Sequence, residues 1–184
     1  MKRVALATAL ALTVTAPLRA QSVAPMHDPS LNCVLDAVPA DQRVLAGPAA
    51  SQQLTDAPEE APELSGAALE TIRAALSRCA ETSHWTENQR ELALQYTLMQ
   101  LTRDDMIRRY AAQNVDLTYI DQMIAAAQPN TAFPFEAMVA RMRAQGVGDN
   151  RPDSAADIVW LYMMMVAQSA EIRANFADPN FRPQ

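Results

Sequence analysis

The sequence predicts an all-α protein, a single compact domain of about five substantial helices preceded by one or two short N-terminal helices. Apolar residues recur at spacings of three and four through most of residues 30–177, and no segment alternates as a half-buried strand does. The 184 residues include only four glycines, about a third of average usage. Sandwiches, propellers and glycine-looped nucleotide folds need more residues that tolerate positive φ, so these folds are disfavoured.

The first twenty residues have the layout of a secretory signal peptide. Lys2 and Arg3 form a positive start, residues 4–16 are an uncharged stretch of 13 residues, and Ala20 supplies a small residue for cleavage. Thirteen residues are too few to span a bilayer. We therefore expect residues 1–20 to be removed and the mature protein to be exported, to a periplasmic or extracellular location.

Export would change the charge of the chain. The full sequence has 15 basic and 21 acidic residues, a net charge of −6, and the leader holds three of the basic residues and none of the acidic ones. The mature chain would carry a net charge of −9 and would repel phosphate backbones and anionic membrane surfaces. We expect no nucleic-acid partner and no membrane span in the mature chain.

Two cysteines, Cys33 and Cys79, remain after the leader is removed. An even number of cysteines in an oxidising compartment predicts a disulfide, and only one intramolecular pairing exists. Closing this 46-residue separation would stabilise the fold by about 4 kcal/mol in the chain-entropy model. The alternative is a pair of unrelated buried thiols, because free cysteine packs as a small hydrophobe.

The start of the mature chain predicts two short helices. Residues 21–29 are polar and punctuated by proline, so we expect a loose lead-in. Ser30 caps a helix over residues 31–38, with apolar side chains on one face. Residues 39–46 form a second helix that begins at a proline, and Gly47 with Pro48 is expected to end it.

A loop and a clear amphipathic helix follow. Residues 48–64 are rich in proline, alanine and acid without an apolar period, which predicts a surface loop within the one domain. Ser65 then caps a helix whose apolar positions recur at spacings of three and four. These positions are Leu69, Ile72, Leu76 and Cys79. The spacing places Cys79 on the buried face of this helix.

Capping residues define the next two helices. Thr86, with Gln89 three residues later, forms a capping box at the start of a long helix that reaches about Asn114. Asp116 caps a shorter helix that ends before Pro129.

The last two helices have equally clear ends. Pro134 opens a helix that Gly146 ends, and Ser154 caps the C-terminal helix. Residues 158–167 in that helix are apolar on all sides, too short a run to span a membrane, so we expect a central helix packed on most of its surface. We expect residues 178–184 to be a frayed tail.

Four residues between two predicted helices form a candidate cleft: Glu81, His84, Trp85 and Glu87. Two acids beside an aromatic ring could perform glycoside chemistry in a small cell-envelope enzyme. The other histidine, His27, lies in the lead-in, and the motifs HExxH, CxxC and GxSxG are missing from the sequence. We therefore expect no metal and no cofactor, and treat an enzyme as the alternative hypothesis.

Methionine is frequent in the predicted helices. Met138 and Met142 are one turn apart, and Met163, Met164 and Met165 are consecutive. Their positions on apolar stripes favour core packing, although the same stripes could line a groove for an apolar ligand or a partner helix. A third hypothesis is a Cu(I) binder, since copper prefers thioether sulfur.

The sequence therefore predicts an exported, non-enzymatic helical protein, stabilised by one disulfide. It would bind an unknown protein partner or a small apolar ligand.

Overall fold

The computed structural model describes residues 29–54, 66–127, 132–150, 154–178 and 181, and these segments contain seven α-helices and no strand. The all-α prediction is confirmed. In chain order the helices are α1 (Pro29–Ala37), α2 (Ala40–Leu54), α3 (Gly66–Ser83), α4 (Glu87–Ala111), α5 (Thr118–Ala126), α6 (Phe135–Ala144) and α7 (Ala155–Ala177). The predicted leader, residues 1–20, and residues 21–28 of the predicted lead-in lie outside the described residues, whereas Pro29, the last lead-in residue, begins α1.

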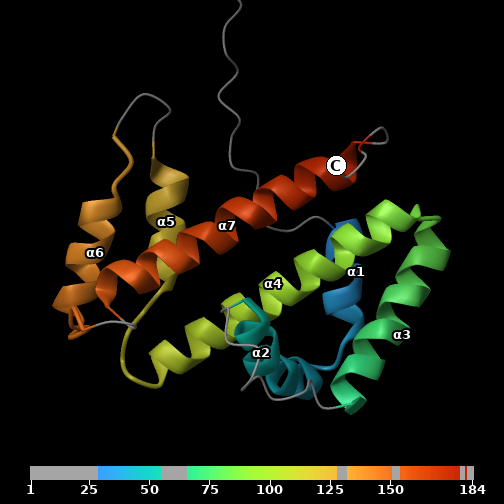
Figure 1. Cartoon of the computed structure of the whole chain (residues 1–184), viewed down its shortest axis with the longest axis horizontal. Helices are drawn as coiled ribbons and strands as arrows, with labels where there is room; N and C mark the ends of the chain where they lie inside the picture. Colours follow the sequence, from blue (N-terminus) through green and yellow to red (C-terminus); the bar gives the residue numbers. More distant parts are fainter. Residues whose placement is uncertain (1–28, 55–65, 128–131, 151–153, 179–180, 182–184) are drawn as a thin grey trace, which may run out of the picture.

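The two longest helices, α4 and α7, form the axis of the fold (Figure 1). They run antiparallel, because Gln89 near the start of α4 bonds to Phe176 near the end of α7. Arg103, further along α4, bonds to Tyr162 in the first half of α7. Helices α1 and α3 pack at one end of this pair, α5 and α6 pack at the other, and α2 packs against the middle and second half of α4 (Figure 1).

Buried apolar side chains form two clusters. Cluster 1 joins α1, α2, α3, the first half of α4 and the end of α7, and includes Ile72 and Tyr96. Cluster 2 joins the second half of α4, α5, α6 and the first half of α7, and includes Met138 and Tyr162. Because α4 and α7 belong to both clusters, the chain forms a single compact domain.

The two cysteines form a disulfide that links α1 to α3. The Cα atoms of Cys33 and Cys79 are 6.0 Å apart, within the range that disulfides require. Cys79 is buried on the inner face of α3, whereas Cys33 is only half-buried on α1. The bridge therefore approaches α1 from its flank, as expected from the position of Cys33 beside the apolar stripe of that helix.

The predicted helix starts at Thr86, Pro134 and Ser154 agree with the structure. Two others are wrong, because Ser30 lies inside α1 and Leu117, not Asp116, is the N-cap of α5. The predicted cap Ser65 lies outside the described residues.

The Thr86 hydroxyl accepts a bond from the backbone N–H of Gln89, and the Gln89 side chain accepts one from the Thr86 N–H, which completes the capping box. The Ser154 hydroxyl accepts a bond from the N–H of Asp157 at the start of α7. Each of these bonds satisfies an N–H group that has no partner within its helix.

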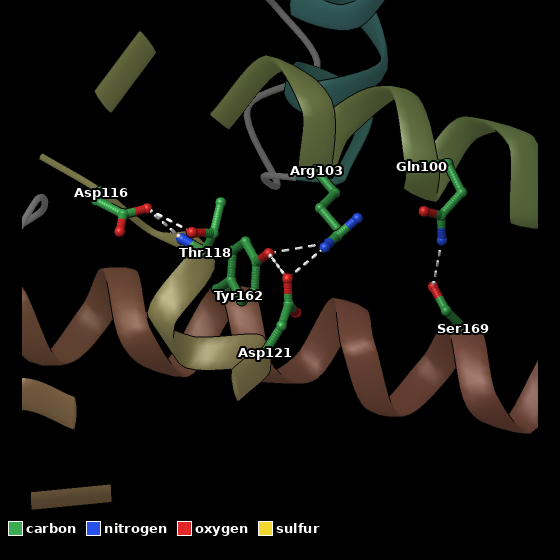
Figure 2. Close-up of polar contacts among 7 residues, drawn as sticks. All are labelled: Gln100, Arg103, Asp116, Thr118, Asp121, Tyr162 and Ser169. Atoms are coloured by element: carbon green, nitrogen blue, oxygen red, sulfur yellow. Dashed lines mark hydrogen bonds and ion pairs between the residues drawn. The ribbon is translucent and has the colours of Figure 1, made fainter. Parts of the chain in front are cut away.

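Asp116 holds the start of α5. Its Oδ1 atom accepts bonds from the N–H and the hydroxyl of Thr118, at 2.8 and 2.7 Å (Figure 2). These bonds stabilise the carboxylate and lower the pKa of Asp116 below its ordinary value. The backbone of Asp116 is also bound to the amide of Gln145, just after α6, so this short segment joins the two helices.

Two helices end on left-handed residues other than glycine. His84 after α3 has a φ of 53° and Asn114 after α4 has a φ of 62°, while Gly146 after α6 has the φ of 93° that its predicted role requires. The N–H of Trp85 bonds to the carbonyl of Ala80 across the first of these turns, as in a Schellman cap. A chain with few glycines thus places other residues in conformations that glycine adopts at lower cost.

The predicted end of α2 at Gly47 and Pro48 is wrong. The helix continues to Leu54, so the expected loop over residues 48–64 begins as helix, and residues 55–65 lie outside the described residues. Gly47 is buried close to α4, where an added Cβ would lie 3.3 Å from the carbonyl oxygen of Leu101. The packing of Gly47 against α4 offsets the loss of the backbone hydrogen bond that Pro48 cannot donate. Pro48 itself lies on the exposed side of the helix.

The C-terminal helix lies centrally but is not covered on all sides. The apolar side chains of Trp160 and Met164 are 57% and 36% exposed. At the other end, Phe181 packs against cluster 1 and its carbonyl accepts a bond from Asn88, so this part of the predicted frayed tail is held in place. Among the described residues, no helix is both long enough and apolar enough to cross a membrane.

Candidate functional site

The predicted cleft residues lie together at the junction of α3 and α4. Glu81, His84 and Glu87 are exposed there, and Glu87 pairs with Arg90 at 3.3 Å. Trp85 points inward instead, where its ring meets the edge of Phe176 with centroids 5.4 Å apart. This contact gives Trp85 a packing role between the α3–α4 turn and α7.

The methionines proposed as a groove belong mostly to cluster 2. Met138, Met142 and Met165 are buried, Met163 is half-buried against the same cluster, and Met164 is exposed. Their placement is that of core side chains, with Met164 on the outer surface of α7. Within the described part of the chain, no group of three or more His, Cys, Asp or Glu residues is placed to hold a metal ion.

A groove of about 300 Å³ lies between α4 and α7. Its floor is apolar, because Leu92 and Ile172 are core residues of cluster 1 and Met99 and Phe181 pack against that cluster. Its walls are polar and comprise Asn88, Glu91 and Gln95 on α4 with Gln168, Glu171 and Asn175 on α7. We call this site the α4–α7 groove.

The walls of the α4–α7 groove carry four amides and two carboxylates above an apolar floor. Amide groups both donate and accept hydrogen bonds, and carboxylates accept them. Glu91 accepts one bond within its own wall, from Gln95 at 3.4 Å. Glu171 stands on the opposite wall, so a polar ligand that enters the groove meets acceptors from two helices.

Polar side chains cross between α4 and α7 beside this groove and fix the two helices relative to one another (Figure 2). The amide of Gln100 donates to the hydroxyl of Ser169 at 3.2 Å, and Ser169 in turn lies 3.7 Å from the sulfur of Met99 in the groove. Both Gln100 and Ser169 are buried, so this pair is protected from competition by bulk water.

Further along, Arg103, Asp121 and Tyr162 tie α4, α5 and α7 together (Figure 2). The Arg103 Nε–H donates to the Tyr162 hydroxyl at 2.9 Å, and that hydroxyl donates to Asp121 Oδ2 at 2.9 Å. Arg103 also forms an ion pair with the same Asp121 oxygen. Burial opposes the charge of Arg103, yet its interactions with Tyr162 and Asp121 outweigh this and raise its pKa. Burial raises the pKa of Tyr162, so the phenol stays neutral.

A second groove of about 340 Å³ lies between α2 and α4. It is lined by Arg43 and Val44 of α2 and by Asp104, Ile107 and Arg108 of α4 among others. Burial raises the pKa of Asp104, although three nearby arginines act in the opposite direction. Arg108 already pairs with Asp105 at 3.1 Å. Charges of both signs therefore face this groove, and its lining indicates the charge of a ligand less clearly than the lining of the α4–α7 groove does.

Sequence reasoning missed the residues of the α4–α7 groove. A signal existed in each helix alone, because Asn88, Glu91 and Gln95 share one face of α4 and Gln168 and Asn175 share one face of α7. These two faces meet because α4 pairs with α7 in antiparallel orientation. The spacing of residues within one helix does not predict how that helix pairs with another.

No protein-family model, curated protein or solved structure matches this chain.

Proposed function

We propose that this protein is exported and acts by binding a ligand in the α4–α7 groove, without catalysing a reaction. The main support is the groove itself, which combines an apolar floor with hydrogen-bonding walls from two helices. Sites of this kind bury the apolar part of a ligand and orient it with a few polar groups.

The chemistry of the groove favours binding over catalysis. Its lining consists of amides, two carboxylates and apolar side chains. Hydroxyl, thiol and amine nucleophiles act with an adjacent base, and none of the ten lining residues is Ser, Thr, Cys, Lys or His. The two carboxylates, Glu91 and Glu171, lie on opposite walls, where both can accept hydrogen bonds from a bound ligand. The exposed acids of the predicted α3–α4 cleft lie outside this lining.

Two observations support export. The first twenty residues have the pattern of a cleavable leader. The Cys33–Cys79 disulfide is of the kind typical of proteins in compartments where thiols are oxidised.

The groove can be tested with one blocking variant and one matched control. Gln168→Trp places a large ring in the groove wall, whereas Ala170→Trp adds the same ring to an exposed position of α7 outside the lining. We expect small polar fragments, screened by ¹⁵N–¹H NMR against the exported, disulfide-bonded protein, to shift the amides of Glu91 and Gln95. These shifts should vanish in Gln168→Trp and persist in Ala170→Trp.

Two results would contradict the proposal. A screen in which no fragment perturbs groove residues would remove the binding site, and equal perturbation in both tryptophan variants would place binding elsewhere. Export has its own measurement, since the mass of the recovered protein should correspond to a chain that begins at Gln21 and has lost two hydrogens at the disulfide.

A further inference from the structure

An exposed apolar strip on α7 leads into the α4–α7 groove. Trp160 and Met164 are one helical turn apart, so both lie on the same face of α7, and both are exposed. Gln168, in the groove wall, is one further turn along that face. At a rise of 1.5 Å per residue, the surface from Trp160 to Asn175 is roughly 22 Å long.

Exposed tryptophan is uncommon on a surface without a partner. Tryptophan is enriched at the energetic centres of protein interfaces, where its large ring is buried on binding. In this chain the other tryptophan, Trp85, is half-buried against Phe176, as aromatic side chains of a folded core are. Trp160 lacks such cover, with 57% of its surface exposed.

The groove end of this surface is negative. Glu91 on α4 and Glu171 on α7 are both exposed in its walls. In the part of the chain that the structure describes, neither carboxylate has an ion-pair partner. Glu91 accepts a hydrogen bond from a neutral amide, that of Gln95. A cationic group on a ligand would complement both carboxylates.

We propose that the strip and the groove together dock a basic, amphipathic segment of another protein. This inference rests on the proposed function and adds the class of ligand. Apolar side chains of the segment would cover Trp160 and Met164, while its Lys or Arg side chains would reach Glu91 and Glu171. A helical segment of about 15 residues, or an extended one of about seven, matches the roughly 22 Å available.

The length and the charge of this surface distinguish a polypeptide from other ligands. A small amine would fill the groove and leave Trp160 exposed. Nucleic acid and anionic membranes are repelled by the two unpaired carboxylates and by the net charge of −6 for the whole chain. A basic amphipathic segment satisfies the apolar strip and the carboxylates at once, as helices do when they bind in grooves.

The tryptophan in the strip provides the readout. We would titrate the exported protein with a synthetic amphipathic Leu/Lys peptide and with a Leu/Glu peptide of the same pattern. The Lys peptide should shift the fluorescence of Trp160 to shorter wavelength, because docking removes the indole from water. The shift should disappear in Trp160→Phe, which retains Trp85, and the Glu peptide should produce none.

Variants of the two carboxylates test the charge. Glu91→Gln and Glu171→Gln should each weaken binding of the Lys peptide by roughly 1.5- to 5-fold at low salt, the range for exposed ion pairs. The difference in affinity between each variant and the wild type should shrink as salt is added. Glu136→Gln, at an exposed position of α6, makes the same charge change outside the groove and should have little effect. Trp160→Ala should weaken binding by about tenfold or more.

Several outcomes would overturn this inference. They are equal binding of both peptides, equal effects of Glu136→Gln and the groove variants, no shift of Trp160 emission, and no binding at all. If anionic vesicles shift the emission of Trp160 and the Lys peptide does not reverse that shift, the partner is a membrane and not a protein. The proposed function fails separately, in the fragment screen, where Gln168→Trp and Ala170→Trp decide whether the groove binds anything.

Discussion

We can test whether the Arg103–Asp121–Tyr162 network stabilises the fold by comparing two variants, each of which loses the hydroxyl of one buried tyrosine. Tyr162→Phe and Tyr119→Phe delete the same atom from side chains that are both fully buried. The Tyr162 hydroxyl bonds to two charged groups, Arg103 and Asp121, each at 2.9 Å. The Tyr119 hydroxyl donates to one neutral group, the carbonyl of Met138, at 2.6 Å.

The structure gives an expected magnitude for each variant. A hydrogen bond to a charged group contributes about 1.5–3 kcal/mol, and a neutral one about 1 kcal/mol. Arg103 and Asp121 are 16% and 26% exposed and stay paired with each other after the hydroxyl is lost, which reduces the penalty. We therefore expect Tyr162→Phe to lower the free energy of unfolding by about 2 kcal/mol and Tyr119→Phe by about 1 kcal/mol.

Two other differences between the tyrosines do not disturb this comparison. An arginine lies over each ring, Arg103 at 5.6 Å from the Tyr162 centroid and Arg141 at 4.5 Å from that of Tyr119, and both substitutions retain the ring. Burial raises the pKa of Tyr162, and it raises that of Tyr119 to about 12. Both phenols are therefore neutral at pH 7.

Urea denaturation at pH 7, with equal slopes for wild type and variants, measures the two free energies. If Tyr162→Phe lowers stability no more than Tyr119→Phe does, the two bonds to charged groups contribute no more than one neutral bond, and the expected extra stabilisation from charge is refuted.

Two further predictions concern other features of the fold. Cys33→Ser should lower the free energy of unfolding by about 4 kcal/mol and by as much as the Cys33→Ser/Cys79→Ser double variant, because either change opens the loop of 46 residues; a double variant as stable as wild type in non-reducing urea titrations would contradict this. His84→Gly should raise stability by up to about 1 kcal/mol, because glycine adopts the φ of 53° without strain. His84→Ala is the control, and thermal unfolding that shows equal gains in both would point to a cause other than the backbone.

Local chemistry made most helix ends predictable from the sequence. The capping box at Thr86 and the hydroxyl of Ser154 depend only on residues three positions apart in the chain. Gly146 was predictable for the same reason, since a left-handed turn after a helix favours glycine. The all-α class followed from many such signals along the chain.

The continuation of α2 could not be predicted in this way. Gly47 and Pro48 end a helix when only local preferences act, yet here a distant helix decides the outcome. A Cβ added at Gly47 would lie 2.7 Å from Arg108 Nη2, 3.0 Å from Asp105 Cβ and 3.3 Å from the Leu101 carbonyl oxygen, so a larger side chain would force these atoms of α4 to shift. Sequence preference is overridden where tertiary packing contributes more than the backbone bond that proline removes.

The candidate site was missed because it belongs to a pair of helices. Each wall of the α4–α7 groove resembles an ordinary solvated helix face, and the meaning of Glu91 and Glu171 appears only when the faces are set against each other. The methionines were candidate site residues because methionine is frequent in the predicted helices, but Met138, Met142 and Met165 are buried. Composition identifies unusual residues, whereas a binding groove depends on which residues remain accessible after packing.

The same two helices form the groove and connect the two apolar clusters, which couples binding to stability. The floor of the groove, Leu92 and Ile172, belongs to cluster 1, while α4 and α7 continue into cluster 2. A ligand that contacts both walls binds only when α4 and α7 are correctly paired, so it stabilises the folded state by mass action. The polar pair Gln100–Ser169 and the Arg103–Asp121–Tyr162 network hold that pairing before any ligand arrives. A preorganised groove of this kind binds with less loss of conformational entropy than one that must be assembled by its ligand.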